Sequence, residues 1–171
     1  MIDITDNFLP TEQFQEVQAH LMGALWPWYF NTTVDGPDDE ADSTKSQFTY
    51  GFFNRKDGWI NSGEKVIWPL TRKINPIAWL RIKANLNPWL PTQRQNSYHI
   101  DMNGMGEIPF WTSIYYVNTN NGYTLFEDGQ KVESVANRLV TFPGTTRHTG
   151  CCCTDQKCRV LINFNYIAAY S

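Results

Sequence analysis

The chain contains only three histidines, and one of them begins an H-x-D triplet, His99-Ile100-Asp101. Residues i and i+2 of a β-strand point to the same side, so a strand here would present an imidazole and a carboxylate together. His148 is the strongest candidate for a second imidazole. Two histidines and one carboxylate are the ligands of non-haem Fe(II) oxygenases, and they leave coordination positions open for chemistry. The three residues therefore predict an Fe(II) site.

Arg159 supports this prediction, because an H-x-D triplet is weak evidence by itself. The arginine opens the alternating segment 159–166. A guanidinium that faces a pocket needs an anionic partner, and it binds a carboxylate through two parallel hydrogen bonds. We therefore expect Arg159 to hold a dicarboxylate cosubstrate, with a surface strand cation as the plainer alternative.

Four segments that could position these side chains have the composition or the periodicity of β-strands. Residues 80–87 and 159–166 alternate with period two, and 112–118 and 139–142 are rich in β-branched and aromatic residues. The first segment carries Leu80, Ile82, Ala84 and Leu86 on one face and Arg81, Lys83, Asn85 and Asn87 on the other. One face of such a sheet can meet helices while the other lines a polar cavity.

The N-terminal part of the chain predicts two helices. Residues 11–25 have apolar side chains at helical spacing, with Thr11 as the N-cap. Residues 63–75 predict a second helix, in which Pro69 should lie in the first turn or break the helix. Pro76 should end it.

Helices first and strands later predict a mainly β fold with flanking helices, a sandwich or barrel with the helices packed outside. The length of 171 residues fits one domain over 1–171. We expect helical support over about 1–76 and a metal-binding barrel core over about 78–168.

The composition excludes several classes of protein. Aromatic residues make up 15% of the chain and charged residues only 18%, which excludes a disordered chain. The net charge of −3 argues against a nucleic-acid or anionic-membrane binder. No apolar run approaches the roughly 20 residues of a membrane span, and the acidic N-terminus does not look like a signal peptide. We therefore expect a cytoplasmic protein.

All four cysteines lie within Cys151–Cys158, three of them consecutively at Cys151, Cys152 and Cys153. A disulfide scaffold would spread its cysteines along the chain, so a reducing intracellular setting is expected. Zinc binding is an alternative, but consecutive cysteines fit a tetrahedral site poorly. The plain interpretation is a mixture of buried and exposed thiols.

Six short motifs follow one another from residue 99: H-x-D, T-S-I-Y-Y-V-N, G-Y-T-L-F, N-R-L-V-T-F-P-G, a single H, and R-V-L-I-N-F. Their order resembles that of the Fe(II)/2-oxoglutarate-dependent dioxygenases, most closely the prolyl-4-hydroxylase-like branch. The resemblance covers about residues 80–166. It implies a double-stranded β-helix, which is a jelly-roll or cupin-like barrel, with the metal at one mouth.

The resemblance also implies roles for individual residues. His99, Asp101 and His148 would bind iron, and Arg159 would bind the distal carboxylate of 2-oxoglutarate. Tyr116 would give that carboxylate a phenol hydrogen bond. Thr112 and Ile114 share the face of Tyr116 by strand alternation and would line the cosubstrate slot, whereas Tyr115 points away. Asn85 would be a further cosubstrate contact, and Thr124 and Phe126 would have structural roles.

The activity implied by the resemblance is a hydroxylation that uses Fe(II), 2-oxoglutarate and O₂. Decarboxylation of the cosubstrate to succinate and CO₂ is coupled to hydroxylation of a prime substrate. The first candidate is a peptidyl-proline in a peptide or protein, followed by a free amino acid, with nucleic acid least favoured. Two alternatives remain: a cupin-like non-oxygenase metalloprotein, and a binding module that has lost turnover.

Overall fold

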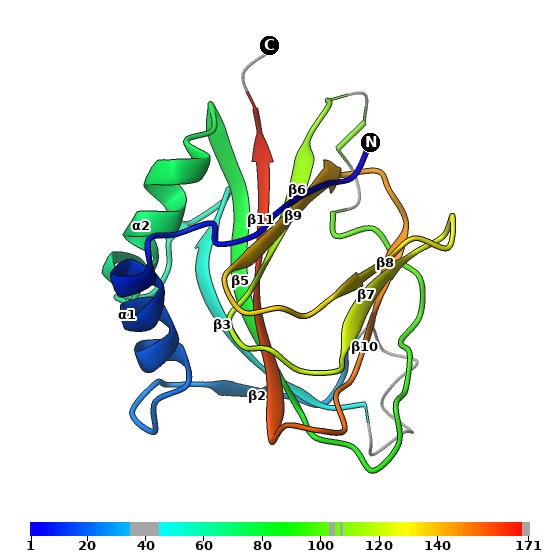
Figure 1. Cartoon of the computed structure of the whole chain (residues 1–171). Helices are drawn as coiled ribbons and strands as arrows, with labels where there is room; N and C mark the ends of the chain where they lie inside the picture. The colour runs from blue at the N-terminus through cyan, green and yellow to red at the C-terminus, as the bar shows by residue number, and fades with distance from the viewer. Residues whose placement is uncertain (35–44, 103–104, 107, 169–171) are drawn as a thin grey trace.

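The computed structural model describes residues 1–34, 45–102, 105–106 and 108–168. Within these residues the chain forms two antiparallel sheets and two helices (Figure 1). In chain order the elements are β1 (Asp3–Thr5), α1 (Thr11–Leu21), β2 (Tyr29–Asn31), β3 (Gln47–Asn54), β4 (Gly58–Trp59), α2 (Glu64–Ile74), β5 (Ala78–Pro88), β6 (Trp111–Tyr116), β7 (Tyr123–Phe126), β8 (Lys131–Glu133), β9 (Arg138–Pro143), β10 (His148–Cys151) and β11 (Cys158–Ile167).

The larger sheet has the strand order β1-β9-β6-β11-β5-β3-β2, with β4 paired to β3. The smaller sheet has the order β10-β7-β8 and lies beside it, away from the helices (Figure 1). Residues around 94–99 extend the smaller sheet beyond β10, because the Asn96 N–H donates to the Gly150 carbonyl over 2.9 Å. This arrangement confirms the expected mainly β fold with flanking helices, a double-stranded β-helix.

The alternation of β5 and β11 divides the interior into two regions. The outward face carries apolar side chains such as Ile82 and Ile162, which pack with Val17 of α1 and Leu70 of α2 in the main core. On the inward face, a second apolar cluster fills part of the space between the sheets. Its members are Ile114, Tyr116, Phe126, Val132, Val140, Phe142 and Leu161. The rest of the inward face is polar and lines a cavity.

The helix α1 ends at Leu21, four residues before the predicted end. Met22 is the C-cap, and Leu25 is 98% exposed, so the apolar spacing that included Leu25 was misleading. Gly23 follows at once, and glycine favours the end of a helix. Thr11 is the first helical residue, and the N-cap is Pro10, which makes no side-chain cap. The N-cap prediction was therefore wrong.

Pro69 lies inside α2, neither in its first turn nor at a break. Proline lacks the N–H that the Lys65 carbonyl would accept, but Lys65 is exposed, so water can replace that bond. The helix ends at Ile74, and its C-cap, Asn75, has a left-handed φ of 45° and lies directly before Pro76. Both helices have 11 residues, and no helix in the described part of the chain is long and apolar enough to cross a membrane.

Candidate metal centre

His99 and His148 lie directly opposite each other across an antiparallel β-bridge. Each backbone N–H donates to the carbonyl of the other residue, over 2.9 and 3.0 Å, and the ring centroids are 4.9 Å apart. Opposed residues of such a pair place their side chains on the same face. Asp101 reaches the same point, and one ligand atom from each of the three residues lies within 4.8 Å of the others. The three side chains form a possible metal site.

The two histidines are held in the same tautomer. The Nδ1 of His99 lies 3.1 Å from the Ser97 carbonyl, and the Nδ1 of His148 lies 3.1 Å from the Thr146 carbonyl. A carbonyl oxygen only accepts, so each Nδ1 carries the proton and each Nε2 carries a lone pair. A backbone carbonyl that orients a ring in this way is the usual support of a histidine metal ligand.

Asp101 is fixed by two donors. Arg81 Nη2 lies 3.1 Å from Oδ1, and Asn165 Nδ2 donates to Oδ2 over 3.0 Å. Arg81 also donates to the Asn165 side chain over 3.0 Å, which joins the two supports. Burial acts to raise the pKa of Asp101, but Arg81, His148, the Asn165 hydrogen bond and His99 together lower it below its usual value. Asp101 is therefore a carboxylate at neutral pH.

The donor set suits Fe(II). Burial lowers the pKa of His148, with Asp101 opposing that shift, so the imidazole is neutral and able to coordinate. Two imidazoles and one carboxylate would occupy one face of a metal and leave the opposite positions open. The His99 side chain is 38% exposed, so these open positions are within reach of solvent and substrates.

A cavity of about 310 Å³ runs from the three candidate ligands to Arg159. Arg159 is only 3% exposed. It donates to Ser134 Oγ over 2.8 Å and to Thr124 Oγ1 over 3.2 Å, and burial lowers its pKa. Among the described residues, no carboxylate forms an ion pair with Arg159. A buried guanidinium without a counter-ion is costly, which makes this end of the cavity a site for an anion.

The predicted residues of β6 occupy different places around this cavity. Ile114 lines it, as does Thr124 of β7. The Tyr116 hydroxyl is fully buried and donates to Thr124 Oγ1 over 2.8 Å, and its ring lies beneath the Arg159 guanidinium. The Thr112 hydroxyl accepts from Asn165 and so lies behind Asp101. Tyr115 points away into the outer core, as the alternation predicts.

Asn85 lines the same cavity from β5, and its Oδ1 is buried without a hydrogen-bond partner among the described residues. Sequence reasoning did not single out Arg81 and Asn165, which support Asp101, or Lys83, which lines the cavity. It gave Thr124 a structural role only, although both Tyr116 and Arg159 donate to its oxygen, which leaves its own proton available to a ligand. The alternating polar residues of β5 and β11 could have indicated Arg81, Lys83 and Asn165, because the alternation places them on the inward polar faces of these strands.

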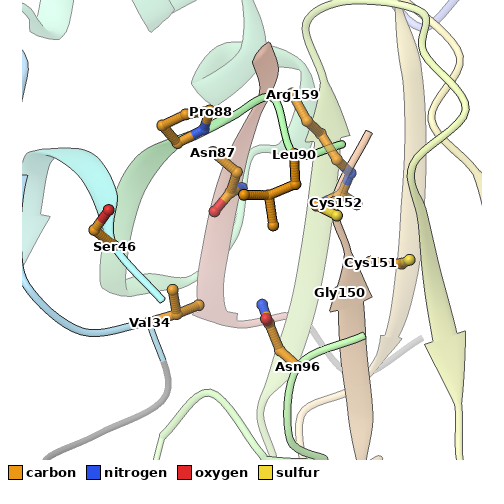
Figure 2. A pocket seen from close by; sticks show the side chains of 10 residues that line it. All are labelled: Val34, Ser46, Asn87, Pro88, Leu90, Asn96, Gly150, Cys151, Cys152 and Arg159. Carbon is orange, nitrogen blue, oxygen red and sulfur yellow. The ribbon is translucent and has the colours of Figure 1, made fainter. Parts of the chain in front are cut away.

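A smaller cavity of about 170 Å³ adjoins the first and shares Asn87, Asn96 and Arg159 with it (Figure 2). Cys151 and Cys152 also line this smaller cavity. All four cysteines are free, with Cys151 and Cys153 buried and the other two half-buried. In the described residues, the only cluster able to hold a metal is the one formed by His99, Asp101 and His148, which disfavours the zinc alternative.

Comparisons with known proteins show similarity at the level of the fold. No protein-family model matches the chain, and neither does any curated protein. Among solved structures, a Trichoplax adhaerens prolyl hydroxylase in complex with a hypoxia-inducible factor peptide fragment is 15% identical, with a TM-score of 0.70 over 97% of this chain and 83% of that one.

Two bacterial structures agree with this result. A Pseudomonas putida prolyl-4-hydroxylase is 12% identical, with a TM-score of 0.58 over 97% of this chain and 92% of that one. A 2-oxoglutarate–Fe(II) oxygenase family protein from Burkholderia pseudomallei is 9% identical, with a TM-score of 0.66 over 96% and 84%. The resemblance found in the sequence is thus confirmed at the level of the fold, which the chain shares with prolyl hydroxylases and other 2-oxoglutarate–Fe(II) oxygenases.

Proposed function

We propose that the protein is an Fe(II)- and 2-oxoglutarate-dependent hydroxylase. The observation that carries the proposal is one cavity with a His-Asp-His cluster at one end and, at the other, the buried Arg159, which forms no ion pair with the described residues. If the protein were a cupin-like metalloprotein that uses no 2-oxoglutarate, the buried Arg159 would have no anion to bind. The contacts that hold Asp101 and both histidines in place argue against a binding module that has lost turnover.

The residues of this chain would bind and orient the reactants. His99, Asp101 and His148 would hold Fe(II), and Arg159 would bind the distal carboxylate of 2-oxoglutarate, with Thr124 donating a further hydrogen bond. Tyr116 would act through Thr124, to which its hydroxyl donates. When bound, Fe(II) with 2-oxoglutarate and O₂ supplies the oxidation, in which the cosubstrate leaves as succinate and CO₂ and one oxygen atom enters the prime substrate.

A peptidyl-proline is the first prime substrate to test. Three of the structures with this fold are named prolyl hydroxylases, and one of them is described as a complex with a peptide fragment. The half-exposed His99 supports this choice, because a peptide segment could approach a metal bound there. Free amino acids are the second class.

Succinate formation tests the proposal directly. The protein is incubated with Fe(II), 2-oxoglutarate, O₂ and ascorbate, with and without proline-containing peptides, and succinate is measured by mass spectrometry. We expect slow succinate release when no peptide is added and faster release when a peptide substrate is present. Asp101→Ala should abolish both, because the carboxylate ligand is lost. Normal turnover in Asp101→Ala would contradict the metal assignment.

A further inference from the structure

The inward face of β5 is a row of four polar side chains that all line the main cavity: Arg81, Lys83, Asn85 and Asn87. At one end, Arg81 contacts Asp101, a candidate metal ligand. At the other end, Asn87 lies opposite Arg159 in the β5–β11 register. Lys83 therefore stands between the candidate metal and the candidate carboxylate site.

Lys83 has no partner of its own among the described residues. Arg81 is neutralised by Asp101, whereas Lys83 makes neither an ion pair nor a hydrogen bond there. Asn163, which lies opposite Lys83 on β11, has a buried Oδ1 that also lacks a hydrogen bond. Burial, followed by repulsion from Arg81, lowers the pKa of Lys83 to about 8. A largely buried ammonium in this position is suited to a ligand anion.

When bound, the proposed cosubstrate would lie next to the Lys83 ammonium. A 2-oxo dicarboxylate held by a metal at the His-Asp-His cluster and by Arg159 at its far end lies across the positions between Arg81 and Asn87. Its two carboxylates would then meet two cations that form no ion pair with the described residues. Resting on the proposed function, we propose that Lys83 binds the metal-side carboxylate of the 2-oxo acid, and that Arg159 binds only the distal one.

Binding measurements with a shortened ligand separate these two ends. The holoprotein is prepared with Mn(II), which does not turn over, and is titrated by calorimetry with 2-oxoglutarate and with 2-oxobutyrate, which lacks the distal carboxylate. Lys83→Met keeps most of the length of the side chain and removes its charge. We expect it to weaken both ligands by about tenfold or more, because a charged hydrogen bond is lost. Arg159→Met should weaken 2-oxoglutarate alone.

Two further variants serve as controls. Lys65→Met removes an exposed lysine of α2 and should leave both affinities unchanged. Lys83→Arg keeps the cation and should restore most of the binding of both ligands. If Lys83→Met does not fold, Lys83→Gln replaces it, because glutamine keeps a polar end in the cavity.

The possible outcomes distinguish this inference from the proposed function. If the wild-type holoprotein binds neither ligand, the proposed function fails and the role of Lys83 fails with it. If the wild type binds 2-oxoglutarate and Lys83→Met binds both ligands equally well, only the role of Lys83 is overturned. If Lys83→Met weakens 2-oxoglutarate but not 2-oxobutyrate, Lys83 serves the distal carboxylate and the assignment of the two ends is wrong.

Discussion

At the scale of single residues, the candidate metal centre depends on side chains that do not themselves reach the metal. Each imidazole is oriented by a carbonyl two residues before it, and Asp101 is held between Arg81 and Asn165. These contacts set which atom carries a proton and where each lone pair points. The affinity for metal should therefore respond to substitutions outside the ligand set.

Asn165 provides a test of this dependence. Asn165→Ala removes the donor to Asp101 Oδ2, so the pKa of Asp101 should rise and its position should loosen. Loss of such a supporting contact typically costs about 10- to 100-fold in metal affinity. Mn(II) binding followed by electron paramagnetic resonance measures this change.

Thr112→Val is the matched control for Asn165→Ala. It removes only the hydrogen bond between Thr112 and Asn165 and leaves the Asn165–Asp101 contact in place. We expect a much smaller loss of Mn(II) affinity in this variant. Equal Mn(II) affinities in Asn165→Ala and the wild type would show that Asp101 needs no such support.

At the scale of elements, the long alternating strands could be predicted and the short ones could not. The segments 80–87 and 159–166 became β5 and β11 with most of their faces as expected, because residues such as Ile82, Ala84 and Ile162 are buried in the main core. Leu80 is the exception, because at the register shift between β5 and β11 it leaves that face and packs with Met105 and Phe110 in a separate cluster. By contrast, β1, β2 and β8 have three residues each and β4 has two. Their existence depends on pairing with distant strands, which local periodicity does not record.

The residues of the candidate site also divide into those that the sequence could predict and those that it could not. His99, Asp101, His148 and Arg159 carry distinctive chemistry and could be singled out from their residue types. The supporting roles of Arg81 and Asn165 depend on the register between β5 and β11, in which the two residues are opposed. The sequence predicts two inward polar faces, but it does not predict which polar residue meets which.

Asn137 joins the N-terminal segment to β9. Its side chain accepts from the Leu9 N–H and the Tyr115 hydroxyl and donates to the Leu9 carbonyl, each over 2.8 Å. Its φ of 63° is a conformation that asparagine tolerates better than most residues. Asn137→Ala should lower the free energy of unfolding by about 2–4 kcal/mol, because buried groups lose their partners.

Urea unfolding measures the effect of Asn137→Ala. Asn121→Ala is the control, because Asn121 also hydrogen-bonds through its side chain, with Thr154, but is exposed. Water can replace those bonds, so we expect a loss within about 1 kcal/mol. Similar small losses in both variants would mean that Asn137 is not a structural tie between the N-terminal segment and β9.

At the scale of the whole molecule, the two faces of the large sheet have different tasks. The N-terminal helices cover the outer face of the large sheet, which leaves its inner face to polar side chains. The cavity has Arg81, Lys83 and Arg159 in its lining although the chain as a whole carries a net charge of −3. This concentration of positive charge inside an acidic protein favours a small anionic ligand over a polyanion.

The buried histidine makes the stability of the metal-free protein depend on pH. The pKa of His148 in the folded state lies below its usual value of 6.5, so the unfolded chain takes up a proton first as the pH falls. The full stability is therefore present above pH 6.5 and declines from there toward the folded-state pKa. Each unit of difference between the two pKa values corresponds to about 1.4 kcal/mol.

Urea unfolding of the metal-free protein between pH 7.5 and about 5 measures this decline. His148→Gln has no titrating ring and should show a smaller loss over the same window. Above pH 3.8, the carboxylate of Asp101 contributes stability that is lost only as the pH falls through its lowered pKa, so it does not obscure the effect. An identical pH profile in the variant and the wild type would exclude His148 as the cause.

The central claim is that one cavity binds Fe(II) and 2-oxoglutarate together. Anaerobic titration of the metal-free protein with both, followed by the visible metal-to-ligand charge-transfer band, tests it most directly. We predict a band that appears only when both are present and that is missing in His148→Ala. Bound Fe(II) without any band on addition of 2-oxoglutarate would contradict the claim and favour a metalloprotein of another kind.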